Sequence, residues 1–294
     1  MGSFVIFADA SSDLSPDYLK ARDVRVLPMT CLSRDGDVRT LTGYEDDDYL
    51  VEMYRDMRAG KMYSTSQITP QEYQKAFEPV LAGGQDVVYI ALSSGLTSTV
   101  ESATMAAEKL NGRHESAKVH VVDSLSASGG IDTLLEKAVC FRDAGQSAEE
   151  AAKKLRVLAK QVCHVFMVTD LMHLCRGGRL SLASAKVGAL LHVIPLLIID
   201  EMGKLEVIDK KRGERGAIKE LRKRFENSWN GQDHRMYAIH GNWPEEAVRL
   251  EQEILEKDPE ARIDKRIISP VIGVHTGPEM LAIIFFGDRA KLKN

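Results

Sequence analysis

A run of hydroxyl residues and one glycine, SSGLTST at 93–99, follows an apolar segment and precedes a helical pattern. Residues 87–92 form an unalternated apolar run of strand length, and apolar residues recur at helical spacing from Thr99 onward. The first N–H groups of a helix have no intrahelical partners, and a glycine lets a ligand approach closely. A junction of this kind, between a strand and the start of a helix, can bind a phosphate or a carboxylate. The alternative is an ordinary helix N-cap, where Ser and Thr are the usual residues.

A second group of hydroxyl residues precedes the helix that is predicted to open at Pro70. Thr69 is the natural N-cap of that helix, with proline in the first helical position. This capping role leaves Thr65, Ser66 and Gln67 unexplained. We therefore expect these three side chains to face a ligand.

Two basic side chains in glycine-rich segments are further candidates. His275 lies in the segment 273–278, which we interpret as a loop, and a loop histidine can donate to an anion and titrate near neutral pH. Its alternative role is a hydrogen bond to a backbone carbonyl. Arg176 and Arg179 flank a glycine pair, where an arginine can bind a carboxylate or phosphate through two parallel N–H groups. The alternative for these arginines is a surface ion pair.

Several strong catalytic patterns are absent from the sequence. It has no GxxxxGK[ST] phosphate loop, no GxSxG elbow around Ser94, and no HExxH or paired-carboxylate constellation. A serine-dependent hydrolase or acyltransferase that uses Ser94 and His275 is the alternative function, although the sequence does not indicate which base would activate the serine. A ligand-free structural or sensory protein is a third possibility.

Length and composition limit the class of protein. At 294 residues, two domains are expected, and 44% hydrophobic and 28% charged residues are ordinary for a globular protein. A net charge of −4 with interspersed basic residues predicts no nucleic-acid partner. We find no signal peptide and no apolar segment of transmembrane length. The four cysteines show no metal-ligand spacing, so we expect reduced thiols, no metal site and a cytoplasmic location.

The order of elements predicts an α/β fold with two parts. Strands near 4–8, 87–92 and 119–122 are each followed by a small polar loop and a helix, as in a parallel α/β/α domain, which we place at residues 1–162. Residues 163–294 are richer in hairpin connections and predict an α/β domain with a mixed sheet. Within it, 185–194 is almost uniformly apolar and is interpreted as a buried helix that Pro195 ends.

Six motifs in this order resemble those of the DegV family of bacterial fatty-acid-binding proteins, the binding subunits of fatty acid kinase. They are DASSDL at 9–14, STSQ at 64–67, LSSGLTST at 92–99, VVDSLSAS at 121–128, RGGRLS at 176–181 and HTGPE at 275–279. Each motif is weak alone, but the set is specific and spans the chain nearly end to end. The resemblance implies a parallel α/β domain joined to a mixed-sheet domain, with a long-chain fatty acid buried between them.

The resemblance also implies which residues hold the fatty acid. Its carboxylate would contact Thr65, Ser66, Ser94, Gly95 and His275, with Arg179 and Ser126 as further candidates. We expect the apolar helix to line the tunnel for the acyl chain through Val187, Leu190, Leu191 and Ile194. A fatty acid kinase subunit would then phosphorylate the bound carboxylate. The chain itself would be a cytoplasmic monomer that presents a substrate, with no cofactor and no catalytic residue.

Three positions depart from the pattern common in the family. Ile68 stands where many members have proline, Ile194 where they have lysine, and Glu279 where they have glycine. Glu279 is the most consequential change, because a carboxylate near the mouth of the pocket would oppose an anionic head group unless it points outward.

Overall fold

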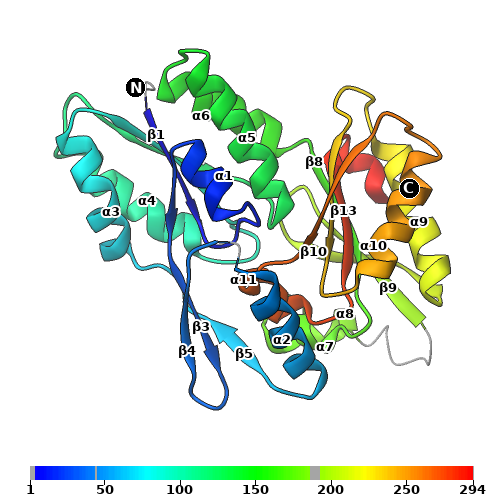
Figure 1. Ribbon diagram of the computed structural model, residues 1–294. Coiled ribbons are helices and arrows are strands. Elements are labelled where there is room, and N and C mark those ends of the chain that lie inside the picture. The colour runs from blue at the N-terminus through cyan, green and yellow to red at the C-terminus, as the bar shows by residue number, and fades with distance from the viewer. Residues whose placement is uncertain (1–3, 44, 186–192, 294) are drawn as a thin grey trace.

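The computed structural model describes residues 4–43, 45–185 and 193–293. Three sheets organise the chain, and the first consists of four parallel strands in the order β2-β1-β6-β7 (Figure 1). Their bounds are β1 Phe4–Asp9, β2 Val24–Leu27, β6 Asp86–Ala91 and β7 Val119–Asp123. The predicted parallel sheet of the first half is confirmed.

Helices cover both faces of this parallel sheet (Figure 1), which explains why β1 and β6 are apolar without alternation. α3 and α4 pack together on one side, and α5 and α6 pack together on the other. The helices of this half are α1 Pro16–Ala21, α2 Asp47–Arg58, α3 Pro70–Ala82, α4 Thr99–Asn111, α5 Gly129–Asp143 and α6 Ala148–Ala159. Thr69 caps α3 as predicted, in a capping box with Glu72.

A small antiparallel sheet extends below the parallel sheet in Figure 1, and its strands contact the second-half segment Pro270–Thr276. Its order is β4-β3-β5, with β3 Met29–Ser33, β4 Val38–Leu41 and β5 Tyr63–Thr65. Helix α2 follows β4 and crosses to the second half, where the Tyr54 hydroxyl donates to the carbonyl of Ile268 at 3.0 Å. These elements bring first-half side chains next to second-half ones.

The third sheet is mixed, as predicted for the second half, with the order β10-β9-β8-β13-β11-β12. Only β11 and β12 are parallel, and the other neighbours are antiparallel. The strands are β8 Val162–Met167, β9 Val193–Ile199, β10 Leu205–Arg212, β11 Arg235–His240, β12 Arg262–Ile267 and β13 Leu281–Phe286. The helices are α7 Met172–Arg176, α8 Leu182–Ala185, α9 Glu214–Ser228, α10 Pro244–Leu255 and α11 Pro270–Thr276, with a 3-10 turn η2 at Arg289–Lys293.

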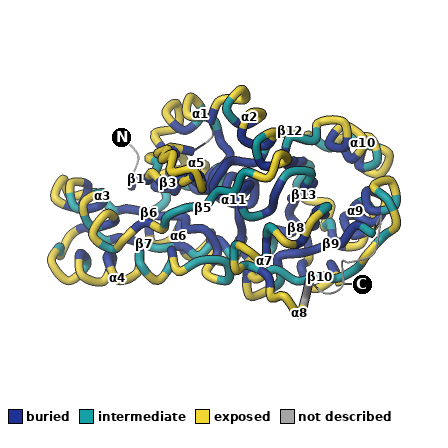
Figure 2. The backbone as a smooth tube through the Cα atoms, turned by 90° about the horizontal axis from the view of Figure 1, so that it is seen from below, coloured by how far each residue is buried: buried dark blue, intermediate teal, exposed yellow. Residues whose placement is uncertain are grey.

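The two faces of the mixed sheet pack against different partners. In β8, Cys163, Val165 and Met167 pack in the core beneath α9 and α10, whereas Val162 and Phe166 belong to the core shared with the first half. β13 alternates in the same way. Figure 2 shows α7 and α11 lying between the two halves, with exposed residues concentrated on the outer helices. In the described part of the chain, no helix is long and apolar enough to cross a membrane.

The predicted end of the apolar helix is wrong. Val193 and Ile194 belong to β9 rather than to a helix, and Pro195 lies inside that strand; residues 186–192 lie outside the described ranges. Proline is tolerated there because β9 pairs with β8 only from Leu196 onward. At Pro195 the strand therefore has a neighbour on one side, β10, and no ladder bond to β8 is lost.

Candidate functional site

An apolar cavity of about 230 Å³ lies between the mixed sheet and the first half of the molecule. A buried water needs roughly 10–15 Å³ by this measure, so the cavity can hold a far larger guest. Its walls come from alternate strand residues that face the first half and from loops of both halves. The apolar lining includes Met29, Leu92, Leu96, Phe166, Leu174, Ile199, Ile239, Met280, Ala282 and Ile284.

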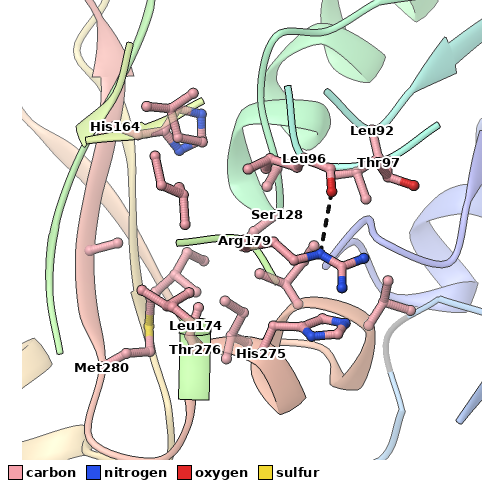
Figure 3. Close-up of a pocket in the computed structure, with 18 of the residues that line it drawn as sticks. Leu92, Leu96, Thr97, Ser128, His164, Leu174, Arg179, His275, Thr276 and Met280 are labelled. Carbon is pink, nitrogen blue, oxygen red and sulfur yellow. Dashed lines mark hydrogen bonds between the residues drawn. The ribbon is translucent and has the colours of Figure 1, made fainter. Parts of the chain in front are cut away.

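Three polar side chains predicted from the sequence meet at one end of this cavity. Thr65 Oγ1 and His275 Nε2 lie 3.0 Å apart in a hydrogen bond between the two halves. Figure 3 shows the Arg179 side chain between Leu96 and His275, and its Nε donates to the Leu96 carbonyl at 3.3 Å. Ser66 also lines the cavity, and its Oγ accepts from the backbone N–H of Thr30 at 3.2 Å. The hydroxyl proton of Ser66 remains for another acceptor.

Short elements hold these groups in place. Thr65 ends β5, where it pairs with Cys31 of β3. His275 lies in the last turn of α11, so the predicted loop position is corrected to a helix end. Its Nδ1 lies against Gly177, where an added Cβ would come within 2.6 Å, so the first glycine of the RGGR motif makes room for the imidazole. Arg179 follows Gly177 by two residues, so the RGGR motif places a guanidinium beside His275.

The electrostatics of this end favour an anion. Arg179 is half-buried, and burial alone lowers the pKa of its guanidinium, because no carboxylate of the described residues forms an ion pair with it. The pKa of His275 falls to about 4, first because the ring is buried and second because Arg179 is nearby. At neutral pH the site therefore carries one uncompensated positive charge, a neutral imidazole and at least two hydroxyl groups.

Other predicted contacts do not line the cavity. Ser94 is exposed, and its backbone N–H donates to Asp123 at 3.2 Å. Gly95 packs so closely on the backbone of Gly203 that any side chain would clash, which gives this glycine a packing role between the halves. Ser126 is buried and accepts from Arg289 Nη2 at 3.2 Å. The loop contributes Leu92, Leu96 and Thr97 to the lining instead.

Ile194, the one predicted tunnel residue that the structure describes, is not part of the cavity lining. Ile194 shares its strand face with Leu196 and Ile198, and all three pack in the core on the side of α9, away from the cavity. Val187, Leu190 and Leu191 lie outside the described residues.

Glu279 does not oppose a ligand, because it forms an ion pair outside the cavity. Its Oε1 lies 3.0 Å from Arg58 Nε, at the end of α2, and its Oε2 accepts from Thr169 at 3.3 Å. The residue takes a left-handed φ of 59°, a conformation that suits the glycine common in the family. Ile68 is buried in the core next to the Thr65–Gln67 segment. Both departures are therefore compatible with an anion at Arg179.

Four polar residues of the lining, Thr97, Ser128, His164 and Thr276, were not predicted as carboxylate contacts. The signal for His164 was present, because strand residues of even number in 162–166 share a face.

The geometry also bears on the hydrolase alternative. A serine nucleophile needs a hydrogen bond to its base. Here Nε2 of His275 is paired with Thr65, and no hydrogen bond joins the Ser94 hydroxyl to His275 in the described part of the chain.

Together, the fold and the cavity define a two-part α/β protein with an internal apolar site and a cationic end. The family model described as "Uncharacterised protein, DegV family COG1307" matches residues 3–288. The chain belongs to the DegV family.

Individual relatives agree with this assignment. The chain is 33% identical over 291 residues to a DegV domain-containing protein of Streptococcus pyogenes serotype M3, covering 98% of this chain and 100% of the relative. Among solved structures, a DegV family protein from Thermus thermophilus, described by its fatty acid binding, has a TM-score of 0.84 at 28% identity, with 98% and 100% of the two chains covered. The Fatty Acid Kinase (Fak) B3 protein of Streptococcus pneumoniae, loaded with linoleic acid, has a TM-score of 0.82 at 23% identity, covering 97% and 100%, a similarity of fold.

Proposed function

We propose that this chain binds a long-chain fatty acid in the cavity, with the carboxylate at Arg179, Thr65 and His275 and the acyl chain along the apolar wall. One observation carries this proposal. A half-buried guanidinium without an acidic partner among the described residues faces a mainly apolar cavity. Burying such a charge is costly unless an anion compensates it. A fatty acid supplies that anion together with an apolar tail.

The two parts of the ligand would contribute differently to affinity. Each buried methylene contributes about 0.8 kcal/mol, so a long chain supplies most of the binding free energy. The carboxylate fixes the direction in which the ligand lies, through charged hydrogen bonds to Arg179 and the hydroxyl of Thr65. Ser66 lines the cavity and is a further hydrogen-bond donor for the carboxylate. Contacts of the carboxylate with Ser94, Gly95 and Ser126 stay predictions. The fatty acid binding described for the Thermus thermophilus relative supports the same ligand class.

We further propose that the bound carboxylate is presented to a fatty acid kinase subunit, which forms the acyl phosphate in the cytoplasm. This step rests on the resemblance of the six motifs to those of kinase-binding family members. The polar end of the cavity, at the junction of β5, α7 and α11, is where the carboxylate would be reached. The chain would act as a non-catalytic, cofactor-free carrier in this system.

Denaturing extraction of the purified protein, followed by mass spectrometry, tests the ligand. We expect about one fatty acid per chain, and rebinding to delipidated protein in a direct titration. No binding of saturated or unsaturated fatty acids of several lengths would refute the proposal.

For the kinase step, hydroxylamine-trapped acyl phosphate should form only when kinase, ATP and the loaded chain are combined.

A further inference from the structure

The lining of the cavity stops at one row of residues across the mixed sheet. In β13, Ala282 and Ile284 line the cavity, and the next residue on the same face, Phe286, lies outside the lining formed by the described residues. In β8, His164 lines the cavity and Val162 does not. His164 lies opposite Ile284 in the antiparallel register, and Val162 lies opposite Phe286. Both strands therefore leave the cavity at the same level.

This row lies away from the proposed carboxylate site. Figure 3 shows His164 across the cavity from His275, with apolar side chains such as Leu174 between them. A fatty acid whose carboxylate lies at Arg179 and His275 would therefore direct its terminal methyl group toward the row of His164 and Ile284.

The start of α5 closes the cavity over this row. Ser128 lines the cavity, and Gly129 and Gly130, which follow it in the first turn of the helix, lie directly on the sheet. A Cβ at Gly129 would come within 3.3 Å of Ile284 Cδ1, and a Cβ at Gly130 would collide with the ring of His164. Because the two glycines lack side chains, the helix backbone meets the strands here and ends the cavity.

The hairpin between β9 and β10 closes the same end on its other side. Ile199 and Leu205 are paired at the base of this hairpin, and both line the cavity. The turn between them packs on loops of the first half, where the carbonyl of Gly203 accepts from the Ser93 hydroxyl at 2.8 Å. A Cβ at Gly203 would come within 3.3 Å of the backbone of Leu125. The helix and the hairpin together leave a closed end.

A closed apolar end limits the length of a ligand. Each methylene that the cavity buries raises the affinity about four-fold. A methylene for which there is no room has to displace side chains of a close-packed interior, which costs free energy. Affinity should therefore rise with the length of the acyl chain until its methyl group reaches the closed end, and then fall.

We propose that Ile284, packed against Gly129 of α5, sets the longest acyl chain that this protein accepts. This inference rests on the proposed fatty-acid function and specifies its substrate class by chain length. Ile284 is buried, lines the cavity and reaches from the strand to the first turn of the helix. The size of its aliphatic side chain therefore decides how far the terminal methyl group of a ligand can extend.

The test is a competition among saturated fatty acids that lengthen by two carbons at each step, from lauric to behenic acid. An equimolar mixture is offered to the full, delipidated chain, and the bound acids are extracted and quantified by mass spectrometry. Ile284→Ala removes three carbons at the closed end. Ile283→Ala is the matched control, because the neighbouring isoleucine is equally buried but packs on the other face of the sheet, in the core beneath α9. All proteins receive the same mixture, so differences in solubility among the acids cancel.

The expected result is a shift in the length at which binding falls. In the native chain, the bound amount should drop about ten-fold between the longest accepted acid and the next acid of the series. Ile284→Ala should move this drop by one step toward longer acids. Ile283→Ala should leave the drop at the native position, even if it lowers the stability of the protein.

Other outcomes overturn the inference. Bound acids of the same lengths in the native chain and in folded Ile284→Ala would show that the ligand does not reach this residue. An equal shift in Ile283→Ala would assign the effect to a general loosening of the sheet. A native chain without any drop in the series has no closed end for its ligand. Failure of all the acids to bind refutes the proposed function itself.

A milder variant decides if Ile284→Ala does not fold, as judged by thermal melting. Ile284→Val removes one carbon from the same position. The bound share of the first acid beyond the native drop should then rise about three-fold. An unchanged share overturns the inference.

Discussion

Replacing Arg179 with glutamine should separate the affinity of the protein for its ligand from its own stability. The variant keeps much of the side-chain volume but removes the uncompensated charge at the end of the cavity. Losing charged hydrogen bonds to a carboxylate costs about 1.5–3 kcal/mol, or about ten- to hundred-fold in affinity. The acyl chain keeps its contacts, so binding should weaken without being abolished.

The ligand-free protein should respond differently. In the folded state Arg179 donates to two carbonyls, those of Leu96 and Gly177, but it also bears the cost of being half-buried without an acidic partner in the described chain. These effects oppose each other, so we expect the free energy of unfolding to change by less than about 1 kcal/mol.

Urea unfolding with and without fatty acid measures both quantities in one assay. At a free ligand concentration of about 100 times the native Kd, the ligand should stabilise the native chain by about 2.7 kcal/mol. At the same concentration the gain for Arg179→Gln should fall to between about 0.4 and 1.4 kcal/mol. Arg176→Gln is the matched control, because Arg176 belongs to the same motif but is exposed and outside the lining. Equal ligand-dependent stabilisation of native chain and Arg179→Gln would refute the assignment of the carboxylate to this end.

Three further predictions concern the packing and charge around the site. Gly95→Ala should destabilise the protein by about 1–3 kcal/mol, because the added methyl group would overlap the backbone of Gly203; an unchanged melting temperature would contradict this contact. Glu279→Gly removes a left-handed strain of about 1–2 kcal/mol and an ion pair with Arg58 worth at most about 1 kcal/mol. We therefore expect equal or greater stability in urea, whereas Glu279→Ala should lose up to about 1 kcal/mol, and the reverse order would disprove the strain argument. For His275, whose pKa falls from 6.5 to about 4 on burial, the unfolded chain binds the proton more readily. Stability of the ligand-free protein should therefore decline as pH falls through this range, by up to about 1.4 kcal/mol per pH unit, and His275→Gln should flatten the measured profile.

Much of the fold could be predicted from local patterns. The unalternated apolar runs at β1 and β6 require cover on both faces, and Thr69 caps α3 as expected. The apolar segment that ends at Ile194 was predicted to be a helix, because an apolar run of that length is compatible with a buried helix and with a central strand equally well. Pairing decides between them, because Val193, Ile194 and Pro195 lie opposite Arg212, Lys211 and Lys210 of β10.

The candidate site was predictable in its chemistry but less so in its geometry. Thr65, Arg179 and His275 were marked by their residue types in glycine- and hydroxyl-rich segments, and the fold brings them together. The positions of Ser94 and Ser126 depend on how loops pack against Asp123 and Arg289, which no spacing in the sequence encodes. The direction of a side chain in a loop depends on tertiary contacts. In strand β8 it follows from the alternation of successive residues between the two faces of the sheet.

The position of β13 in the middle of the mixed sheet has a consequence for folding during synthesis. β8 leaves the ribosome long before β13, yet the two strands are neighbours, as are β13 and β11. Until residues 281–286 emerge, both β8 and β11 keep an unpaired edge that can associate with other chains. Ala282 and Ile284 of β13 also form part of the cavity wall. The nascent chain therefore closes its sheet and acquires its binding cavity in the same late step, and a ligand can be received only after the edges most prone to aggregation have been paired.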